Sequence, residues 1–331
     1  MIRISAGTAA CMGLKKIWAE VKPTTAYLLL GEHCLMGCAF CPQSRGSLML
    51  PGQLGRVNWP LFTLEELSTG LKQGEGEGIK RVCLQGVRGQ DGPGPLLDML
   101  GRIKESTGLP VCVSAWIGGI GEAARLFEAG ADRVSIALDA ATPKVFTRVK
   151  GGSFRERCRL LRECARRWPS RVSTHIILGL GETEEEALFL MDSLYREGIT
   201  VALFAFAPLK GTPLAGQAPP EPASYRRAQA ASYLLQEKRL DIAKLQFHQG
   251  RLVSFGLAPG ELKGLLRGGR AFETRGCPDC NRPFYNERPG GFMYNYPRPL
   301  TKEEEEAALR LITGAEEEGE GFHEGKVAPG T

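Results

Sequence analysis

Three closely spaced cysteines constrain this chain more than any other feature. Cys34, Cys38 and Cys41 stand at the spacing C-x3-C-x2-C, directly after a short apolar run at 26–30 that predicts a strand. Thiolates placed in this way in one short loop can converge on a single metal centre. An iron–sulfur cubane offers four ligand positions, so three cysteines leave one iron open for chemistry. The alternatives are a zinc site, which usually takes a fourth protein ligand, or three unrelated buried thiols.

With Phe40 before the last cysteine, this loop resembles the signature loop of radical S-adenosylmethionine (SAM) enzymes. The resemblance implies a [4Fe–4S] cluster on the three cysteines, with the amino and carboxylate groups of SAM on the fourth iron. It also implies reductive cleavage of SAM to methionine and a 5′-deoxyadenosyl radical, which abstracts hydrogen from an unactivated carbon. The continuation Cys41-Pro42-Gln43-Ser44 is similar to the loop of biotin synthase and its relatives, which insert sulfur.

Length and composition restrict the remaining possibilities. The 331 residues predict one large or two modest domains. A net charge of +5 is too small to indicate a nucleic-acid partner. No run of 18 apolar residues occurs, so no membrane-spanning helix is expected, and the first residues do not resemble a signal peptide. The ten cysteines are not arranged as a small disulfide scaffold, which predicts a reducing, cytoplasmic location.

Strands and helices alternate along most of the chain, which predicts parallel β/α units. Strands are expected at 26–30, 81–85, 110–114, 133–138, 172–178 and 199–207. Helices are expected at 64–73, 95–104, 121–129, 153–167, 183–196, 224–239 and 301–312, four of them opened by the capping-box pairs Thr63/Glu66, Ser153/Glu156, Thr183/Glu186 and Thr301/Glu304. We predict an α/β fold, a TIM-like barrel that is partial or complete, with 241–247 as a candidate seventh strand. A doubly wound sheet is the alternative.

The pattern divides the chain into four parts. Residues 1–24 form an N-terminal extension, 25–255 the barrel, and 256–313 a segment for an auxiliary cluster and substrate. Residues 314–331 are acidic and Gly-rich, and they are expected to be a disordered tail.

Further positions resemble the SAM-binding residues of the family. Ile177, Gly179 and Glu182 match an I-x-G-x-x-E stretch that contacts adenine, although such a stretch is also an ordinary strand-to-helix turn. Asp139 ends the fourth strand, where it either faces the ribose or substrate or caps the next turn. The other expected cofactor-binding positions are Phe40, Gln85, Gly86 and Pro208. Val87 stands where many family members carry a glutamate for the amino group of SAM.

The other cysteines suggest a second cluster. Cys83 and Cys112 stand where biotin synthase carries two ligands of a [2Fe–2S] cluster, but Ser173 replaces the third, so two buried core thiols are the competing interpretation. Cys277 and Cys280 form a C-x2-C pair without local partners. In lipoyl synthases both chain ends ligate an auxiliary [4Fe–4S] cluster. This resemblance implies Cys11, Cys277 and Cys280 as auxiliary ligands, with an unidentified fourth.

The segment 276–300 is irregular and rich in Arg and Tyr, which fits a binding lid. The residues expected to contact substrate are Tyr285, Tyr294, Tyr296, Arg282, Arg288 and Arg298. Together with the opening stretch that runs from 5–9 to Tyr27, the segment resembles one subunit of a two-protein lipoyl synthase. The resemblance implies an octanoylated carrier protein or peptide as substrate, a second radical SAM subunit, and an electron donor of the ferredoxin or flavodoxin type.

The predicted function is sulfur insertion into an octanoyl chain carried on a protein lysine. The first alternative is a biotin-synthase-like or hydrogenase-maturase-like reaction on a small molecule. The alternative from another class is an iron–sulfur scaffold or electron carrier that cleaves no SAM.

Overall fold

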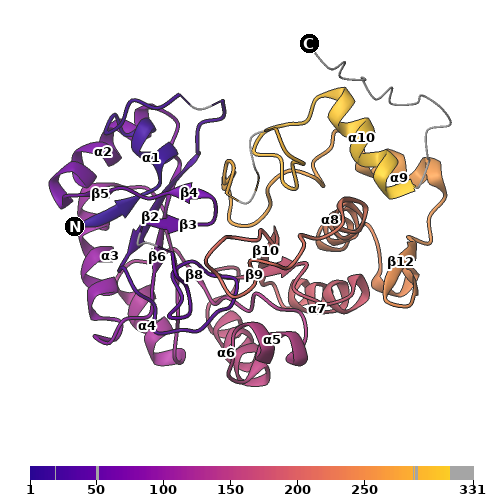
Figure 1. Ribbon diagram of the computed structural model, residues 1–331, viewed down its shortest axis with the longest axis horizontal. Helices are drawn as coiled ribbons and strands as arrows, with labels where there is room; N and C mark the ends of the chain where they lie inside the picture. Colours follow the sequence, from indigo (N-terminus) through magenta and orange to yellow (C-terminus); the bar gives the residue numbers. More distant parts are fainter. Residues whose placement is uncertain (19, 50–51, 286, 288–289, 314–331) are drawn as a thin grey trace, which may run out of the picture.

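The computed structural model describes residues 1–18, 20–49, 52–285, 287 and 290–313 (Figure 1). The expected disordered tail, 314–331, lies outside the described residues. The strands are β1 (Ile2–Ile4), β2 (Thr25–Leu30), β3 (Gln53–Leu54), β4 (Val57–Asn58), β5 (Leu61–Phe62), β6 (Arg81–Gly86), β7 (Val111–Ala115), β8 (Arg133–Ser135), β9 (Val172–Leu178), β10 (Thr200–Ala205), β11 (Gln246–His248) and β12 (Arg251–Ser254). The helices are α1 (Ala6–Cys11), α2 (Leu64–Gly76), α3 (Gly94–Ser106), α4 (Ile120–Glu128), α5 (Pro143–Val149), α6 (Phe154–Arg167), α7 (Glu184–Arg196), α8 (Pro222–Gln236), the 3-10 turn η1 (Ile242–Lys244), α9 (Pro259–Leu266) and α10 (Lys302–Thr313).

Eight strands form one sheet in the order β10-β9-β8-β7-β6-β2-β1-β5. The six strands from β2 to β10 are parallel and follow one another in sequence order, whereas a doubly wound sheet would reverse its order at a switch point. β1 and β5 extend the β2 edge as antiparallel strands. Among the described residues, β10 pairs only with β9, so the sheet is a partial barrel. The TIM-like prediction is confirmed in this partial form.

The two faces of the parallel sheet differ in chemistry. Side chains alternate between faces along a strand, so one set packs against the helices and the other points into the barrel. The helix-facing set is aliphatic and fully buried, as Leu28, Val82 and Val113 illustrate. The inner set includes Tyr27 and Cys83, which belong to a separate cluster. The strands therefore turn polar and sulfur-bearing side chains such as Tyr27 and Cys83 toward the barrel interior.

The helix starts form largely as the capping signals predict. Complete capping boxes join Thr63 with Glu66 and Thr183 with Glu186, and Thr301 makes the same reciprocal pair with Glu304. Ser153 Oγ accepts the Glu156 N–H at the start of α6. Local side-chain bonds therefore fix where these helices begin.

The candidate seventh strand at 241–247 is wrong. Asp241 Oδ1 accepts the N–H of Ala243 at 3.0 Å, which starts η1 instead of a strand. Within the described residues, β11 then pairs with β12 alone in a two-stranded hairpin, because Gln249 and Gly250 adopt positive φ and turn the chain back. The hairpin lies beside α7 and α8, outside the barrel sheet (Figure 1).

The C-terminal segment returns to the open side of the barrel. Figure 1 shows it, in orange, between the N-terminal strands and helices α8 and α10. Arg226 of α8 is almost fully buried and donates hydrogen bonds to the carbonyls of Met293 and Tyr294, which hold this segment in place.

None of the helices in the described part of the chain combines the length and apolar character needed to cross a bilayer.

Candidate functional site

The cysteine loop follows β2 at the carboxyl end of the sheet, where barrels of this kind assemble their chemistry. Its backbone is held by neighbouring elements: the Leu35 N–H donates to the Arg88 carbonyl at 2.9 Å, and the Ala39 N–H donates to the Val149 carbonyl at 2.7 Å. Phe40 packs into an apolar cluster with residues of α5. The loop is therefore anchored to α5 and to the segment after β6.

The three thiols of this loop lie close enough to influence one another. The pKa of Cys41 is raised to about 12, mainly by burial and to a smaller extent by the neighbouring Cys38 and Cys34. Burial also raises the pKa of Cys38 to about 12, although the nearby Lys150 ammonium acts in the opposite direction. The N–H of Arg88 points at Cys34 Sγ at 3.4 Å, a contact that stabilises a ligating thiolate.

The donor set fits a cluster in which each iron takes its own thiolate. Three cysteines come from one short loop, and a backbone N–H already donates to one of the sulfurs. In the described part of the chain, no three His, Cys, Asp or Glu side chains are compact enough to enclose one metal ion. A cluster is larger than an ion, so its ligands need not surround a single point.

A cavity of about 160 Å³ opens beside this loop, between the strand ends and the C-terminal segment. Four of the predicted cofactor-binding residues line it, Phe40, Gln85, Asp139 and Ile177, together with Cys41. The rest of its wall is mainly apolar and aromatic. The structure thus brings the cysteine loop and strands β6, β8 and β9 to one site.

Four other predicted cofactor-binding residues lie outside this cavity. Any Cβ at Gly86 would lie 3.0 Å from Leu96 Cδ1, so this position faces α3. Gly179 and Glu182 line a separate groove. The carbonyl of Pro208 accepts a hydrogen bond from Arg56 Nη2 at 3.2 Å. In this arrangement Gly86 can offer a ligand only backbone groups.

The turn after β9 is built by Glu182 itself. Glu182 Oε1 accepts the Gly179 N–H at 2.6 Å, and burial raises the pKa of this carboxyl. Gly179 has φ of +97°, and a Cβ there would lie 2.7 Å from Pro220 Cδ, so glycine is required. The motif therefore closes a strand-to-helix turn in this structure, and Ile177 is its only member at the cavity wall.

Asp139 is both a cavity residue and half of a buried ion pair. Its carboxylate lies 2.6 Å from Lys150 Nζ, which also donates to the Ala137 carbonyl at 2.6 Å. The Asp139 side chain is 11% exposed and that of Lys150 4%. Asp139 has φ of +67°, a conformation that asparagine and aspartate tolerate better than most residues. The pair fixes the carboxylate at the cavity.

His175 is a cavity residue that the motif search missed. It lies two positions before Ile177 on the inner face of β9, within 3.4 Å of Ser135 Oγ and beside the ring of Phe204. Burial lowers its pKa to about 4. The alternation along β9 was the available signal, since it places His175 and Ile177 on the same face.

The lowered pKa of His175 predicts that the stability of the fold depends on pH. The pKa of this histidine is lower in the folded protein than in the unfolded chain. As the pH falls through the unfolded pKa, the unfolded chain binds a proton that the folded protein does not bind, and the free energy of unfolding therefore decreases. Between about pH 7 and pH 5 the free energy of unfolding should fall by about 2 kcal/mol more in the native protein than in His175→Gln. Denaturant unfolding of both proteins measures the difference; parallel pH curves would contradict it.

The C-terminal segment forms part of the cavity wall. Tyr285 lines the cavity, and its Oη accepts a hydrogen bond from Gln85 Nε2 at 3.0 Å. Arg282 stacks on Phe204, 4.0 Å from the ring centre. The expected lid is therefore a half-buried part of the cavity wall at these two residues.

The other expected substrate contacts are elsewhere. Tyr294 and Tyr296 surround Arg226 of α8, and Arg298 pairs with Glu304 at 2.7 Å. Arg288 lies outside the described residues.

The auxiliary ligand set predicted from sequence needs correction at Cys11. Cys11 ends α1 within the helix-facing core, and the charged groups that influence it are Lys22 and Glu77. Cys277 instead lies against Cys112 of β7, with their sulfurs 3.7 Å apart. The cause is topological: α1 packs against α2, whereas the C-terminal segment contacts the inner face of β7 and the cavity.

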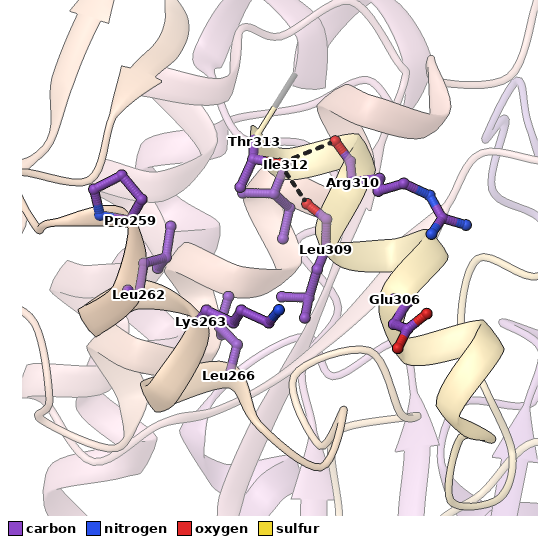
Figure 2. Close-up of a pocket in the computed structure, with 10 residues that line it drawn as sticks. Pro259, Leu262, Lys263, Leu266, Glu306, Leu309, Arg310, Ile312 and Thr313 are labelled. Atoms are coloured by element: carbon purple, nitrogen blue, oxygen red, sulfur yellow. Dashed lines mark hydrogen bonds between the residues drawn. The ribbon is translucent and has the colours of Figure 1, made fainter. Parts of the chain in front are cut away.

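A larger cavity of about 550 Å³ lies between α9 and α10 (Figure 2). Leu262 and Leu266 line it from α9, and Leu309 and Ile312 line it from α10. No residue predicted to act in catalysis or cofactor binding lines it.

Comparisons with known proteins agree with this geometry. Residues 28–194, just over half of the chain, match the model of the radical SAM superfamily. The chain is 27% identical over 228 residues to a biotin synthase of Synechococcus sp., an alignment covering 66% of this chain and 69% of that protein. It is 26% identical over 205 residues to a lipoyl synthase of Shouchella clausii, covering 58% and 61%. The chain thus spans about two thirds of the length of these relatives.

Among solved structures, the fold is similar to that of methylornithine synthase. The TM-score is 0.51 at 20% sequence identity, over 65% of this chain and 63% of that one. This similarity supports the barrel architecture.

Proposed function

The chain belongs to the radical SAM superfamily, and we propose that it inserts sulfur at an unactivated carbon. One observation carries the proposal: the cavity that touches Cys41 on one side is bounded on another by Gln85, two residues beyond Cys83 on the same inner face of β6. A cavity between a SAM-cleaving centre and buried thiols suits a substrate that first loses hydrogen and then gains sulfur.

The chain's own residues define what the site does. Cys34, Cys38 and Cys41 would hold a [4Fe–4S] cluster, which when bound supplies the electron for reductive cleavage of SAM. Phe40 and Ile177 offer apolar contacts beside it, and the Asp139 carboxylate, fixed by Lys150, offers an acceptor for hydroxyl or ammonium groups. Tyr285 and Phe204 narrow the cavity, which limits access of water to a carbon radical.

Within this class we favour an octanoyl chain as the substrate. Apolar and aromatic walls, among them Leu54, Ile177, Phe204 and Phe206, suit an alkyl chain more than a charged small molecule. A chain carried on a lysyl arm can reach the cavity while its carrier protein remains outside. The proposed partners are therefore an octanoylated carrier domain or peptide, a second radical SAM protein for the second sulfur, and a ferredoxin- or flavodoxin-type electron donor.

A biotin-synthase-like reaction is the second candidate. The observation that favours it is the pairing of Cys83 and Cys112 on adjacent strands, the positions at which this chain resembles biotin synthase. None of the ten cysteines forms a disulfide in the structure, which fits a reducing cytoplasm for both candidates.

Mass spectrometry distinguishes the candidates. An octanoyl-lysine peptide, incubated anaerobically with the reconstituted protein, SAM and reductant, should gain one sulfur with this protein alone. Free octanoic acid and dethiobiotin serve as matched small-molecule substrates and should remain unchanged. Turnover of dethiobiotin without any gain on the peptide, with or without a candidate partner protein, would overturn the lipoyl assignment in favour of the biotin-synthase-like one.

A further inference from the structure

Four cysteines from three parts of the sequence meet inside the barrel. Cys83 and Cys112 are direct neighbours in the register of β6 and β7, so their side chains emerge on the same face. That face is the inner one, because Val82, Leu84, Val111 and Val113 all belong to the helix-facing core. Cys277 reaches the same place from the C-terminal segment, with its Sγ 3.7 Å from Cys112 Sγ.

Cys280 approaches Cys83 from its other side. The Cys280 N–H donates to the Cys277 carbonyl at 3.2 Å, which folds the C-x2-C pair into a tight turn. Cys280 Sγ lies 3.4 Å from Tyr27 Oη, and Tyr27 is the register neighbour of Cys83 on β2. Cys280 and Cys83 also belong to one side-chain cluster. The four thiols therefore gather around the inner face of three adjacent strands.

The C-terminal turn is held where the parallel strands begin. Arg81 Nη1 donates to the Pro278 carbonyl at 2.6 Å, and Lys80 pairs with Asp279 at 3.3 Å. Asn281 Oδ1 accepts the Thr24 N–H at 3.0 Å, directly before β2. These contacts fix Cys277 and Cys280 against β6 and β2. The pair is thus positioned by the fold at the end opposite the Cys34 loop.

The location relates these thiols to the proposed chemistry. Gln85, which lines the cavity, lies two residues after Cys83 on the same face of β6, about 7 Å along a strand. The cavity therefore lies between the loop of Cys34, Cys38 and Cys41 and the layer of Cys83 and Cys112. Ser173, which replaces the third cysteine of the biotin-synthase pattern, needs no substitute on β9, because two cysteines arrive from the C-terminal segment.

We propose that Cys83, Cys112, Cys277 and Cys280 hold the second iron–sulfur cluster of this protein. Four thiolates complete the ligand set of either a [2Fe–2S] or a [4Fe–4S] cluster. In this ligand set Cys83 and Cys112 join Cys277 and Cys280. They take the places of Cys11 and of the unidentified fourth ligand in the set inferred from sequence. The role of the cluster as sulfur donor rests on the proposed function, whereas its location rests on the four thiols.

The test uses the variant in which Cys34, Cys38 and Cys41 are all alanine, so that only the second cluster remains. After anaerobic reconstitution, iron and sulfide per chain are measured together with visible absorption and Mössbauer spectra. The parent variant should retain one cluster. Adding Cys83→Ala with Cys112→Ala, or Cys277→Ala with Cys280→Ala, should reduce iron and sulfide to background. Adding Cys11→Ala should leave both unchanged.

Circular dichroism of each variant separates loss of the cluster from loss of the fold. Should an alanine pair fail to fold, the corresponding serine pair is used, and its Mössbauer spectrum should change even if iron is retained. Loss of the cluster in Cys11→Ala with retention in the Cys83/Cys112 pair would overturn the proposal. Binding of zinc alone would also overturn it. An intact cluster without sulfur transfer to any substrate would instead contradict the proposed function and leave the ligand set standing.

Discussion

Replacing Cys34, Cys38 and Cys41 together with alanine should abolish reductive cleavage of SAM and leave the second cluster in place. The three thiols come from one loop, act electrostatically on one another and border the cavity through Cys41. The proposed second site lies on β6, β7 and the C-terminal turn, which share no ligand with this loop. After reduction, the variant should form 5′-deoxyadenosine only at the level of a protein-free control.

The matched control is Cys158→Ala, which removes a buried thiol from α6 on the outer side of the sheet. It should cleave SAM as the native protein does. Undiminished 5′-deoxyadenosine in the triple variant would show that the loop is not the reductive centre. Absence of 5′-deoxyadenosine with the native protein, despite two intact clusters, would favour the iron–sulfur carrier over the enzyme.

Lys150→Met should cause the largest loss of stability among single substitutions at the cavity. Lys150 Nζ contacts both the Asp139 carboxylate and the Ala137 carbonyl at 2.6 Å, and its side chain is 4% exposed. Methionine leaves a buried carboxylate without its cation, a change that costs about 3–5 kcal/mol in buried pairs. Lys150 also acts on the thiol of Cys38, so the substitution affects the cluster loop as well.

Denaturant unfolding of the reconstituted protein measures this loss. Lys144→Met changes an exposed lysine of α5, the helix that ends directly before Lys150, and should shift the free energy of unfolding by less than about 0.5 kcal/mol. Combining Lys150→Met with Asp139→Asn removes the unpaired charge and should recover part of the stability. Equal stability of Lys150→Met and Lys144→Met would mean that the pair contributes nothing to folding.

Local signals in the sequence were sufficient for the six parallel strands and most of the helices between them. Thr63 with Glu66 and Thr183 with Glu186 mark helix starts because a capping box needs only residues within one turn. The parallel strands were recognisable as apolar runs between such helices. The same reasoning failed at 241–247. There the Asp241 side chain accepts a hydrogen bond from the Ala243 N–H, and the residues that follow pair with β12 in a hairpin.

The sequence by itself determined the fold class and the loop of Cys34, Cys38 and Cys41, because both depend on spacing within short segments. Only the tertiary structure decided which other cysteines belong together. A strand buried on both faces is nearly apolar throughout, so its sequence does not show that Cys83 points inward while Leu84 packs against helices. The contact between Cys112 and Cys277 joins residues 165 positions apart. No local pattern encodes such a pairing, because it arises only when the C-terminal segment enters the open barrel.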